Sequence, residues 1–310
     1  MERMKKRVYG IIGLSSLMSN WNADFTGNPK STLDGRIFGS DKALKYSFRK
    51  LWNDQGRKVL YFKTLKKDNL QPMELDEKYE ELFGEGEKSG SKKAKGDKEL
   101  IVLSNLFNTV DGKQFGITFP SKKYSQFSVT GAVQIKQGFN FYKNTVNIQD
   151  VLSPFKNSNN KDADNSSIGK MIFTDETHYF YPFNINPLAY KEFMELEITD
   201  GYTEEDYLKF KEAALSSATS FATNSKVGCD NEFGLFIETE EDFYLPILTQ
   251  YVKFEKGEEK NKITLNLSTI LKGVENHIKN IEIYYNPVTT EIVTDISNYK
   301  LINILTKKEV

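Results

Sequence analysis

The chain has 310 residues, 38% of them hydrophobic and 27% charged, and its net charge at pH 7 is −1. This composition is typical of a folded globular protein and excludes global disorder. Its apolar runs are shorter than the roughly 18 residues that cross a membrane, and no secretory signal is evident, so we expect a cytoplasmic protein. The single cysteine, Cys229, excludes an internal disulfide and a cysteine-built zinc site.

The charges are unevenly distributed along the chain. Residues 41–67 hold nine Lys or Arg and two Asp, a local charge of +7, whereas residues 192–206 hold seven Asp or Glu and no cation. A neutral protein with separate basic and acidic surfaces can bind a polyanion with one surface and a second copy of itself with the other. The alternative is that both runs are simply solvated faces.

The first 55 residues predict a strand, a loop and a helix. Residues 7–14 are rich in Val, Tyr and Ile, which is typical of a buried strand, and a polar loop follows over 18–39. Ser40 is a favourable N-cap for a helix from Asp41 to about Asn53. The apolar stripe predicted for that helix consists of Leu44, Phe48, Leu51 and Trp52. A second, cationic stripe about 110° away consists of Lys42, Lys45 and Arg49.

The middle of the chain predicts short elements between two flexible segments. We expect strands at 58–64, 116–119 and 131–141 and a helix at 99–107. The run 84–96 is rich in Gly, Ser and Lys, and 153–169 is rich in Asn and Asp, so both are predicted to be mobile. Strand character returns at 170–174 and 177–181, which we interpret as the two arms of a projecting hairpin.

The last hundred residues predict a second long helix and several strands. Thr203 caps that helix, and the strands are expected near 233–237, 248–254, 263–267 and 281–285. The order of strands and helices indicates an α+β fold with a ferredoxin-like sheet and large insertions.

Motifs of common catalytic sites are absent from the sequence. There is no phosphate-binding glycine loop, no metalloprotease motif and no nucleophile elbow. His178 lies among aromatic residues, which favours packing over catalysis, and the acids at 238–242 are weak candidates for a cation site. The aromatic residues between 115 and 190 are interleaved with lysines. This combination suits a single-stranded nucleic acid, although core packing accounts for most of these rings.

Six motifs, taken in order, resemble a known family. They are Asn22-Ala-Asp-Phe-Thr-Gly-Asn-Pro, Gly39-Ser-Asp-Lys-Ala-Leu-Lys-Tyr-Ser-Phe-Arg-Lys, Asp111-Gly-Lys-Gln-Phe-Gly, Gly131-Ala-Val-Gln, Gly169-Lys-Met and Tyr181-Pro-Phe-Asn-Ile-Asn-Pro. The set resembles the Cas "seven" family, the backbone subunit of type I CRISPR interference (Cascade) complexes, and is most similar to its subtype I-B branch.

The resemblance implies a single elaborated domain over residues 1–310. Its fold would be an RRM-like palm, a form of the ferredoxin-like fold, with finger, web and thumb insertions at about 15–39, 66–98 and 143–180. The RNA-binding residues it implies are Asn22, Asn28, Lys42, Lys45, Arg49, Lys50, Gln134, Lys170 and Met171. Lys170 and Met171 lie where the thumb returns to the palm, and the thumb would insert an apolar wedge that displaces a guide base.

The resemblance implies a non-catalytic subunit that polymerises along the CRISPR RNA (crRNA) and displays it for pairing with target DNA. Its partners would be the crRNA, the paired DNA strand, further copies of itself and the other Cascade subunits, without a cofactor, a metal or a membrane. The alternative is a CRISPR RNA-processing endoribonuclease on a ferredoxin-like scaffold. That activity needs a general base or a divalent cation near the RNA.

Overall fold

The computed structural model describes residues 2–84, 95–142, 146–152 and 167–310. The two segments predicted to be mobile, 84–96 and 153–169, fall largely outside the described residues. None of the described helices is long and apolar enough to span a membrane.

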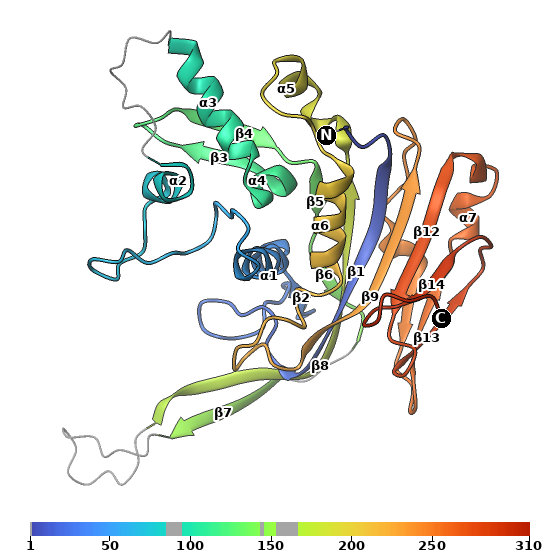
Figure 1. Ribbon diagram of the computed structural model, residues 1–310. Helices are drawn as coiled ribbons and strands as arrows, with labels where there is room; N and C mark the ends of the chain where they lie inside the picture. The colour runs from blue at the N-terminus through green and yellow to red at the C-terminus, as the bar shows by residue number, and fades with distance from the viewer. Residues whose placement is uncertain (1, 85–94, 143–145, 153–166) are drawn as a thin grey trace, which may run out of the picture.

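A large, mainly antiparallel sheet forms the centre of the molecule (Figure 1). Its strand order is β14-β12-β9-β1-β8-β6-β2, and β5 and β7 also pair with β8. The strands are β1 (Arg7–Ser19), β2 (Phe38–Gly39), β5 (Val133–Ile135), β6 (Gly138–Asn140), β7 (Val146–Leu152), β8 (Ser167–Ile185), β9 (Cys229–Thr239), β12 (Ile278–Tyr285) and β14 (Lys300–Asn303). Strand β1 is buried because it lies between β8 and β9 and runs antiparallel to both.

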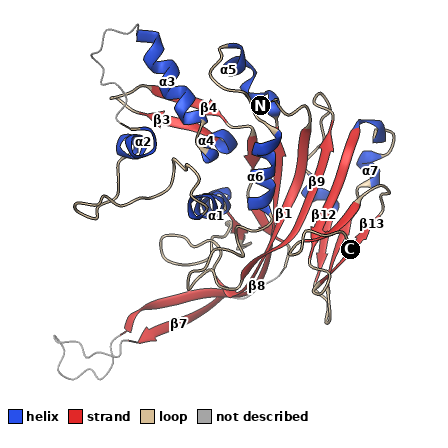
Figure 2. Cartoon of the chain, in the orientation of Figure 1, coloured by secondary structure: helices blue, strands red, loops and turns tan. Residues whose placement is uncertain are grey.

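Helices α1 (Asp41–Asp54) and α6 (Glu204–Ala214) lie on one face of this sheet, as Figure 2 shows, whereas α7 (Ser268–Leu271) packs with the smaller sheet described below. The other helices are α2 (Leu75–Phe83), α3 (Lys95–Phe107), α4 (Val110–Phe115) and α5 (Lys191–Glu195), with 3-10 turns at Pro187–Tyr190, Leu248–Tyr251 and Glu275–His277. Helices α1 and α6 contribute Phe48 and Phe210 to a core shared with Phe183 of β8. A ribbon of β3 (Gly116–Pro120) and β4 (Gln126–Thr130) lies beyond α1.

A second, smaller sheet packs on the opposite face of the large sheet. It consists of β10 (Val252–Glu255), β11 (Asn261–Leu265) and β13 (Thr290–Thr294). Ile263 and Leu265 of β11 pack with Ile11 of β1 and Leu235 of β9 in a separate apolar core. The alternating side chains of β1 and β9 therefore stabilise both layers, and the α+β class predicted from sequence is confirmed.

The two helices predicted from apolar spacing and capping residues, α1 and α6, are confirmed. Helix α1 spans Asp41–Asp54, and the Ser40 hydroxyl accepts a hydrogen bond of 3.2 Å from the Ala43 amide. Leu44, Phe48 and Trp52 are fully buried. Helix α6 begins after Thr203, whose side chain forms a capping box with Asp206.

One predicted strand is wrong, one predicted hairpin is wrong in its pairing, one strand is interrupted and another is partly wrong. Residues 58–64 form no strand, because the amides of Leu60 and Tyr61 donate to the Asp111 carboxylate at 2.8 and 3.0 Å instead of to a neighbouring strand. The stretches 170–174 and 177–181 are not two arms, because both belong to the continuous strand β8. The second arm of that hairpin is β7. The strand predicted at 131–141 is interrupted and forms β5 and β6, and the first half of 248–254 is a 3-10 turn.

The described stretch 66–84 contains an element that the sequence analysis did not predict. This element is helix α2, whose N-terminus carries a capping box formed by Glu74 and Glu77. Tyr79 of this helix is buried and contacts Phe119 and Tyr124 of the β3–β4 region, with ring centroids 5.6 and 4.8 Å apart. Aromatic contacts with a distant segment therefore stabilise a helix that is surrounded by polar sequence.

Candidate nucleic-acid interface

Helix α1 presents its polar side away from the sheet. The buried residues Leu44, Phe48 and Trp52 anchor the opposite side, so the flank that carries the cations keeps a fixed orientation. Lys42 is exposed and forms no ion pair with any residue that the structure describes. It lies in the first turn of the helix and is available to an anion.

The other predicted cations of α1 have partners within the protein. The Lys45 ammonium lies 3.1 Å from Asp41 and 5.3 Å from the centre of the Phe115 ring. Lys50 bonds Asp54 at 2.6 Å on the surface of the helix. The Lys50–Asp54 pair is exposed and so contributes little to stability, whereas the Lys45–Asp41 pair is partly buried.

Arg49 has a different environment from the lysines. Its Nε donates to Asp111 Oδ2 at 3.0 Å, and its guanidinium lies over the rings of Tyr61 and Phe115 at 5.6 and 5.5 Å. Asp111 is fully buried and also accepts the amides of Leu60 and Tyr61. Arg49 therefore joins α1 to α4 and to the 58–64 segment.

An aromatic platform lies on the exposed side of α1, one turn after Lys42. It consists of Tyr46, which is 42% exposed, with Phe62 and Phe221, whose ring centroids each lie 5.6 Å from that of Tyr46. The Tyr46 and Phe62 rings are stacked, with an interplanar angle of 26°. Sequence reasoning missed this platform because its three rings come from segments far apart in the chain.

The loop after β1 packs against the start of α1. Asn22 is buried. Its side-chain oxygen Oδ1 accepts from the Ser40 hydroxyl at 2.8 Å, and its side-chain nitrogen Nδ2 donates to the Phe38 backbone carbonyl at 3.3 Å. A side chain at Gly39 would clash with the Tyr181 hydroxyl, so the loop needs glycine next to the helix cap. Asn22 orients this cap, whereas Asn28 is exposed on the loop and bonds Thr26 at 2.7 Å.

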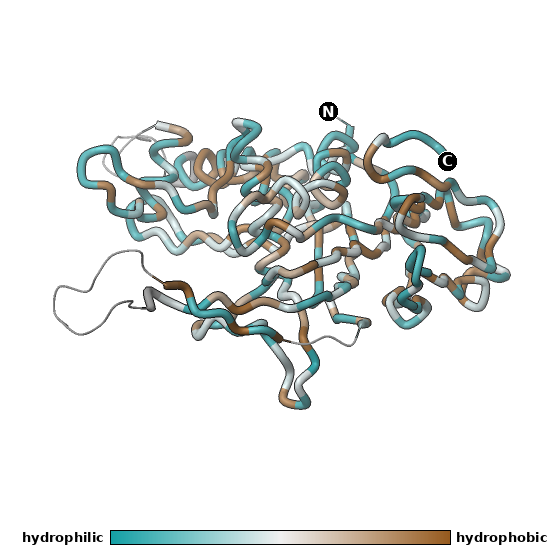
Figure 3. Tube along the Cα trace, turned by 90° about the horizontal axis from the view of Figure 1, so that it is seen from below, coloured by the Kyte–Doolittle hydropathy of each residue, from teal (hydrophilic) through white to brown (hydrophobic). Residues whose placement is uncertain are grey.

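The same loop also contacts the projecting hairpin of β7 and β8. The Asn20 amide donates to the carbonyls of Gly27 and Ile172 at 2.9 and 3.0 Å, which joins the loop to β8. Lys170 and Met171 follow along β8, opposite Asp150 and Gln149 of β7. Lys170 is exposed and Met171 is half-buried. Figure 3 shows the described end of this hairpin projecting from the body with hydrophobic residues along it.

Gln134 belongs to β5 and is exposed, with its amide bonded to the Gly131 carbonyl at 2.8 Å. Three residues later, the side-chain oxygen Oε1 of Gln137 accepts from the Asp41 backbone amide at 3.0 Å. The structure thus gathers the start of α1, the loop after β1, the base of the hairpin and the β5–β6 turn. Whether these residues bind RNA stays a prediction.

His178 is buried between two carboxylates. Its Nδ1 lies 2.9 Å from Glu232 and its Nε2 lies 3.0 Å from Glu176. Burial alone would lower the pKa of His178, but its pairing with the two glutamates outweighs burial and raises it. Both ring nitrogens are thus engaged in the interior, as a hydrogen-bonding role predicts. No group of metal-ligating side chains suited to hold an ion is found among the described residues.

Comparison with known proteins identifies the family. The family model of "CRISPR-associated protein Cas7" matches residues 6–270. The chain belongs to the Cas7 family. The family membership predicted from the six sequence motifs is therefore confirmed, and the matched region includes α1, the hairpin and the loop after β1.

Two solved structures share the fold of this Cas7-family chain. One is titled "CRISPR RNA-guided surveillance complex, pre-nicking". Its chain is 14% identical with a TM-score of 0.52, and the alignment covers 94% of this chain and 96% of that one. The other is titled "CRISPR RNA-guided surveillance complex", with 14% identity, a TM-score of 0.50 and coverage of 93% and 95%. A search of curated proteins found no match.

Proposed function

We propose that the chain is a crRNA-binding backbone subunit of a type I Cascade complex, of the I-B branch, that acts in the cytoplasm. The observation that carries this proposal is the exposed flank of α1. There Lys42, which has no ion-pair partner among the described residues, lies one helical turn from the aromatic platform of Tyr46, Phe62 and Phe221. Cations beside exposed rings suit a single strand, whose phosphates pair with the cations while its bases stack. The names of the structural neighbours, both RNA-guided complexes, support the same function.

We propose that the guide backbone follows α1 and then the loop after β1. Lys42 binds a phosphate directly, while Lys45 and Lys50 exchange Asp41 and Asp54 for phosphate oxygens. Contacts of this kind position an RNA without selecting its sequence, as a subunit that accepts any guide requires. Asn28 on the loop after β1 and Gln134 on β5 are both exposed and would add polar contacts, whereas Arg49 and Asn22 hold neighbouring segments in place.

The β7–β8 hairpin is proposed as the thumb of this subunit. Its exposed apolar residues, including Ile148 and Leu152, have no core to fill, and Met171 lies on the strand that returns to the palm. An apolar side chain inserted between bases displaces one of them, and Lys170 would pair with the adjacent phosphate. The finger, web and thumb would then correspond to insertions at about 15–39, 66–98 and 143–180 of one domain.

The order of the central strands supports an RRM-like palm. Strands β6, β8, β1 and β9 are neighbours in that order, and β1 is antiparallel to both β8 and β9. Helix α1 lies between β1 and β6 in sequence, and α6 lies between β8 and β9. This order matches the βαββαβ arrangement of the ferredoxin-like fold and so supports the proposed palm, which would be enlarged by strands at both edges.

We propose further that copies of the chain polymerise along the guide and, with the other Cascade subunits, display it to a target DNA strand. The acidic run supports contacts between copies, because Glu192, Glu195 and Glu197 are exposed and can face the basic flank of α1. The proposed subunit is non-catalytic. His178 has both nitrogens engaged in the interior, and His277 bonds Glu240 at 2.8 Å.

The experiment is purification of the full chain together with a CRISPR RNA. We expect RNA of uniform length to co-elute, and we expect the Lys42→Ala/Tyr46→Ala variant to lose most of it while melting like the parent. Clean protein without affinity for RNA at low salt would refute the proposal. If guide RNA is cleaved and the cleavage disappears in a folded His178→Gln variant, the endoribonuclease alternative is correct instead.

A further inference from the structure

At the β14 edge of the large sheet, only the second half of β12 is paired with a further strand. Strand β14 pairs with β12 only from Glu282 onward, and the chain end in turn covers β14 through a hydrogen bond of 2.9 Å from the Val310 amide to Leu301. Residues 278–281 of β12 pair with β9 on one side. On the other side they have no strand partner within the part of the chain that the structure describes.

Residues 278–281 of β12 lack this partner because the chain that leads into β14 turns away from β12 before residue 300. If the parallel register continued backward, Asn298 would lie opposite Asn280. Asn298 instead has a φ of 61°, a left-handed conformation that turns the chain out of the sheet. Asp295 fixes the start of this segment, since its carboxylate accepts the Leu267 amide at 2.8 Å and the Ser268 hydroxyl at 2.5 Å.

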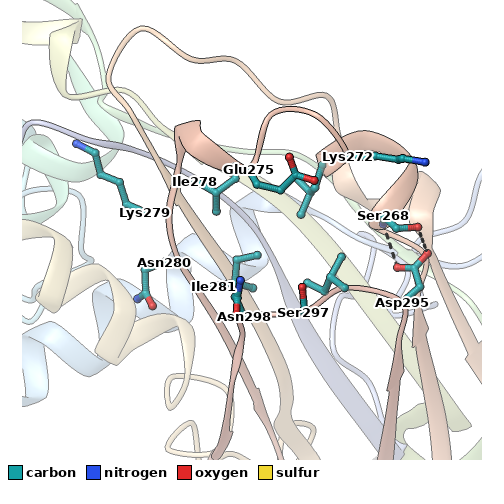
Figure 4. A pocket seen from close by; sticks show the side chains of 12 residues that line it. Ser268, Lys272, Glu275, Ile278, Lys279, Asn280, Ile281, Asp295, Ser297 and Asn298 are labelled. Atoms are coloured by element: carbon teal, nitrogen blue, oxygen red, sulfur yellow. Dashed lines mark hydrogen bonds between the residues drawn. The ribbon is translucent and has the colours of Figure 1, made fainter.

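A pocket of about 290 Å³ opens where the strands separate (Figure 4). Leu271, Ile278, Ile281 and Ile296 provide its apolar lining. Several of its polar groups already have partners. The Asp295 carboxylate is held by α7, the Asn280 amide donates to Glu282 at 3.0 Å, and Glu275 accepts the Gly273 amide at 2.8 Å. The backbone edge of β12 and the apolar lining are therefore the features of this pocket that an extended peptide can use.

An unpaired strand edge beside an apolar pocket selects a particular kind of ligand. The edge offers backbone donors and acceptors at the spacing of a strand, and the pocket takes one side chain, which is how sheet edges recognise extended peptides. We propose that residues 278–281 of β12 dock an extended peptide segment of a partner protein, which adds a short strand and places one large aliphatic side chain in the pocket.

The position of the pocket separates it from the proposed RNA-binding flank. Strands β9, β1 and β8 lie between β12 and β6 in the sheet. The family match ends at residue 270, so most of the pocket comes from sequence beyond the matched region. The docking site therefore lies on a different part of the sheet from the proposed RNA-binding flank, and its test can succeed or fail independently of RNA binding.

The test uses the full chain and a synthetic peptide, acetyl-Lys-Thr-Leu-Thr-Val-Thr-amide, with hydrogen exchange as the measurement. Amides in 278–281 that lack a partner exchange quickly in the free protein, and we expect the peptide at about millimolar concentration to slow them. A peptide with alternate backbone nitrogens methylated keeps the same side chains but cannot pair with the edge. We expect it to bind about tenfold more weakly or not at all.

A variant that fills the pocket is the second arm of the test. Ser297→Trp places a large ring in the pocket and should weaken peptide binding about tenfold. Thr269→Trp is the matched control, because Thr269 is exposed on α7 but does not line the pocket. This control should bind like the parent.

Four results would overturn the proposal. Slow exchange, in the free monomer, of the amides of 278–281 that face away from β9 would mean that residues 296–299 of the chain itself close the edge. Protection that rises with protein concentration would assign the edge to a second copy. Equal binding of the methylated peptide would rule out strand addition, and no protection at millimolar peptide would rule out docking.

Discussion

The two ends of helix α1 carry similar charges in different settings. At its start, Lys42 is exposed without an ion-pair partner among the described residues, whereas two turns later Arg49 is joined to the fully buried Asp111 at 3.0 Å. Both belong to the same cationic stripe in the sequence. Helical spacing places side chains on a face, but only the fold decides whether a charge on that face is used within the protein or remains available to a ligand.

The difference is energetic as well as geometric. A buried carboxylate that loses its cation keeps the cost of burial, whereas an exposed lysine that is removed leaves nothing unsatisfied. The Arg49 end of α1 should therefore govern folding, and the Lys42 end should govern binding. Each of the following predictions tests one side of this division.

The largest expected effect is on stability, at Asp111. Asp111→Ala removes the acceptor for Arg49 and for the amides of Leu60 and Tyr61 in one step. We expect the free energy of unfolding to fall by about 3–5 kcal/mol, as when one partner of a buried ion pair is removed. Urea denaturation followed by tryptophan fluorescence measures this loss.

Asp111→Asn is the matched control. It keeps one oxygen that can accept an amide, so it should lose less stability than Asp111→Ala. A loss below about 1 kcal/mol for Asp111→Ala would contradict the division, because it would mean that Arg49 is not anchored and is free to bind RNA.

The contrast between these residues also shows how far the sequence alone leads. Helix α1, its Ser40 cap and strand β1 were predictable because apolar periodicity and capping residues lie within a few positions of one another. The irregular conformation of 58–64 was not predictable, since its amides bind a carboxylate about 50 residues later in the chain. The charge pattern likewise placed Arg49 correctly on the helix flank but could not reveal its partner.

The projecting hairpin and the aromatic platform were harder to predict for a related reason. Strand β7 is exposed along its whole described length, and its alternation of apolar and polar residues stops at Asp150, which makes it a weak strand signal. Tyr46 lies outside the apolar stripe of α1, and its ring neighbours Phe62 and Phe221 come from other segments. Sites assembled by long-range contacts leave no signal in local spacing.

The next effect in size is on RNA affinity, at Tyr46. Tyr46→Ala should weaken binding of single-stranded RNA by about 1–3 kcal/mol if one base stacks on this ring. Stability should change much less, because Tyr46 is 42% exposed. Tyr46→Phe is the control and should bind like the parent, since it keeps the aromatic face. A Tyr46→Ala variant with parental affinity, measured by fluorescence anisotropy, would exclude a base on the platform.

The smallest effect is expected at Lys42, and it concerns the dependence of binding on salt. Each phosphate contact on a single strand contributes about 0.7 to the slope of log affinity against log salt concentration, because a bound cation releases counterions from the RNA. Lys42→Ala should therefore make the slope shallower by about 0.7 and leave stability within about 0.5 kcal/mol of the parent. Lys42→Arg keeps the charge and should keep the slope. If Lys42→Ala leaves the slope unchanged while Lys45→Ala lowers it, the phosphate lies farther along the helix, and the cation that is paired in the free protein makes the contact.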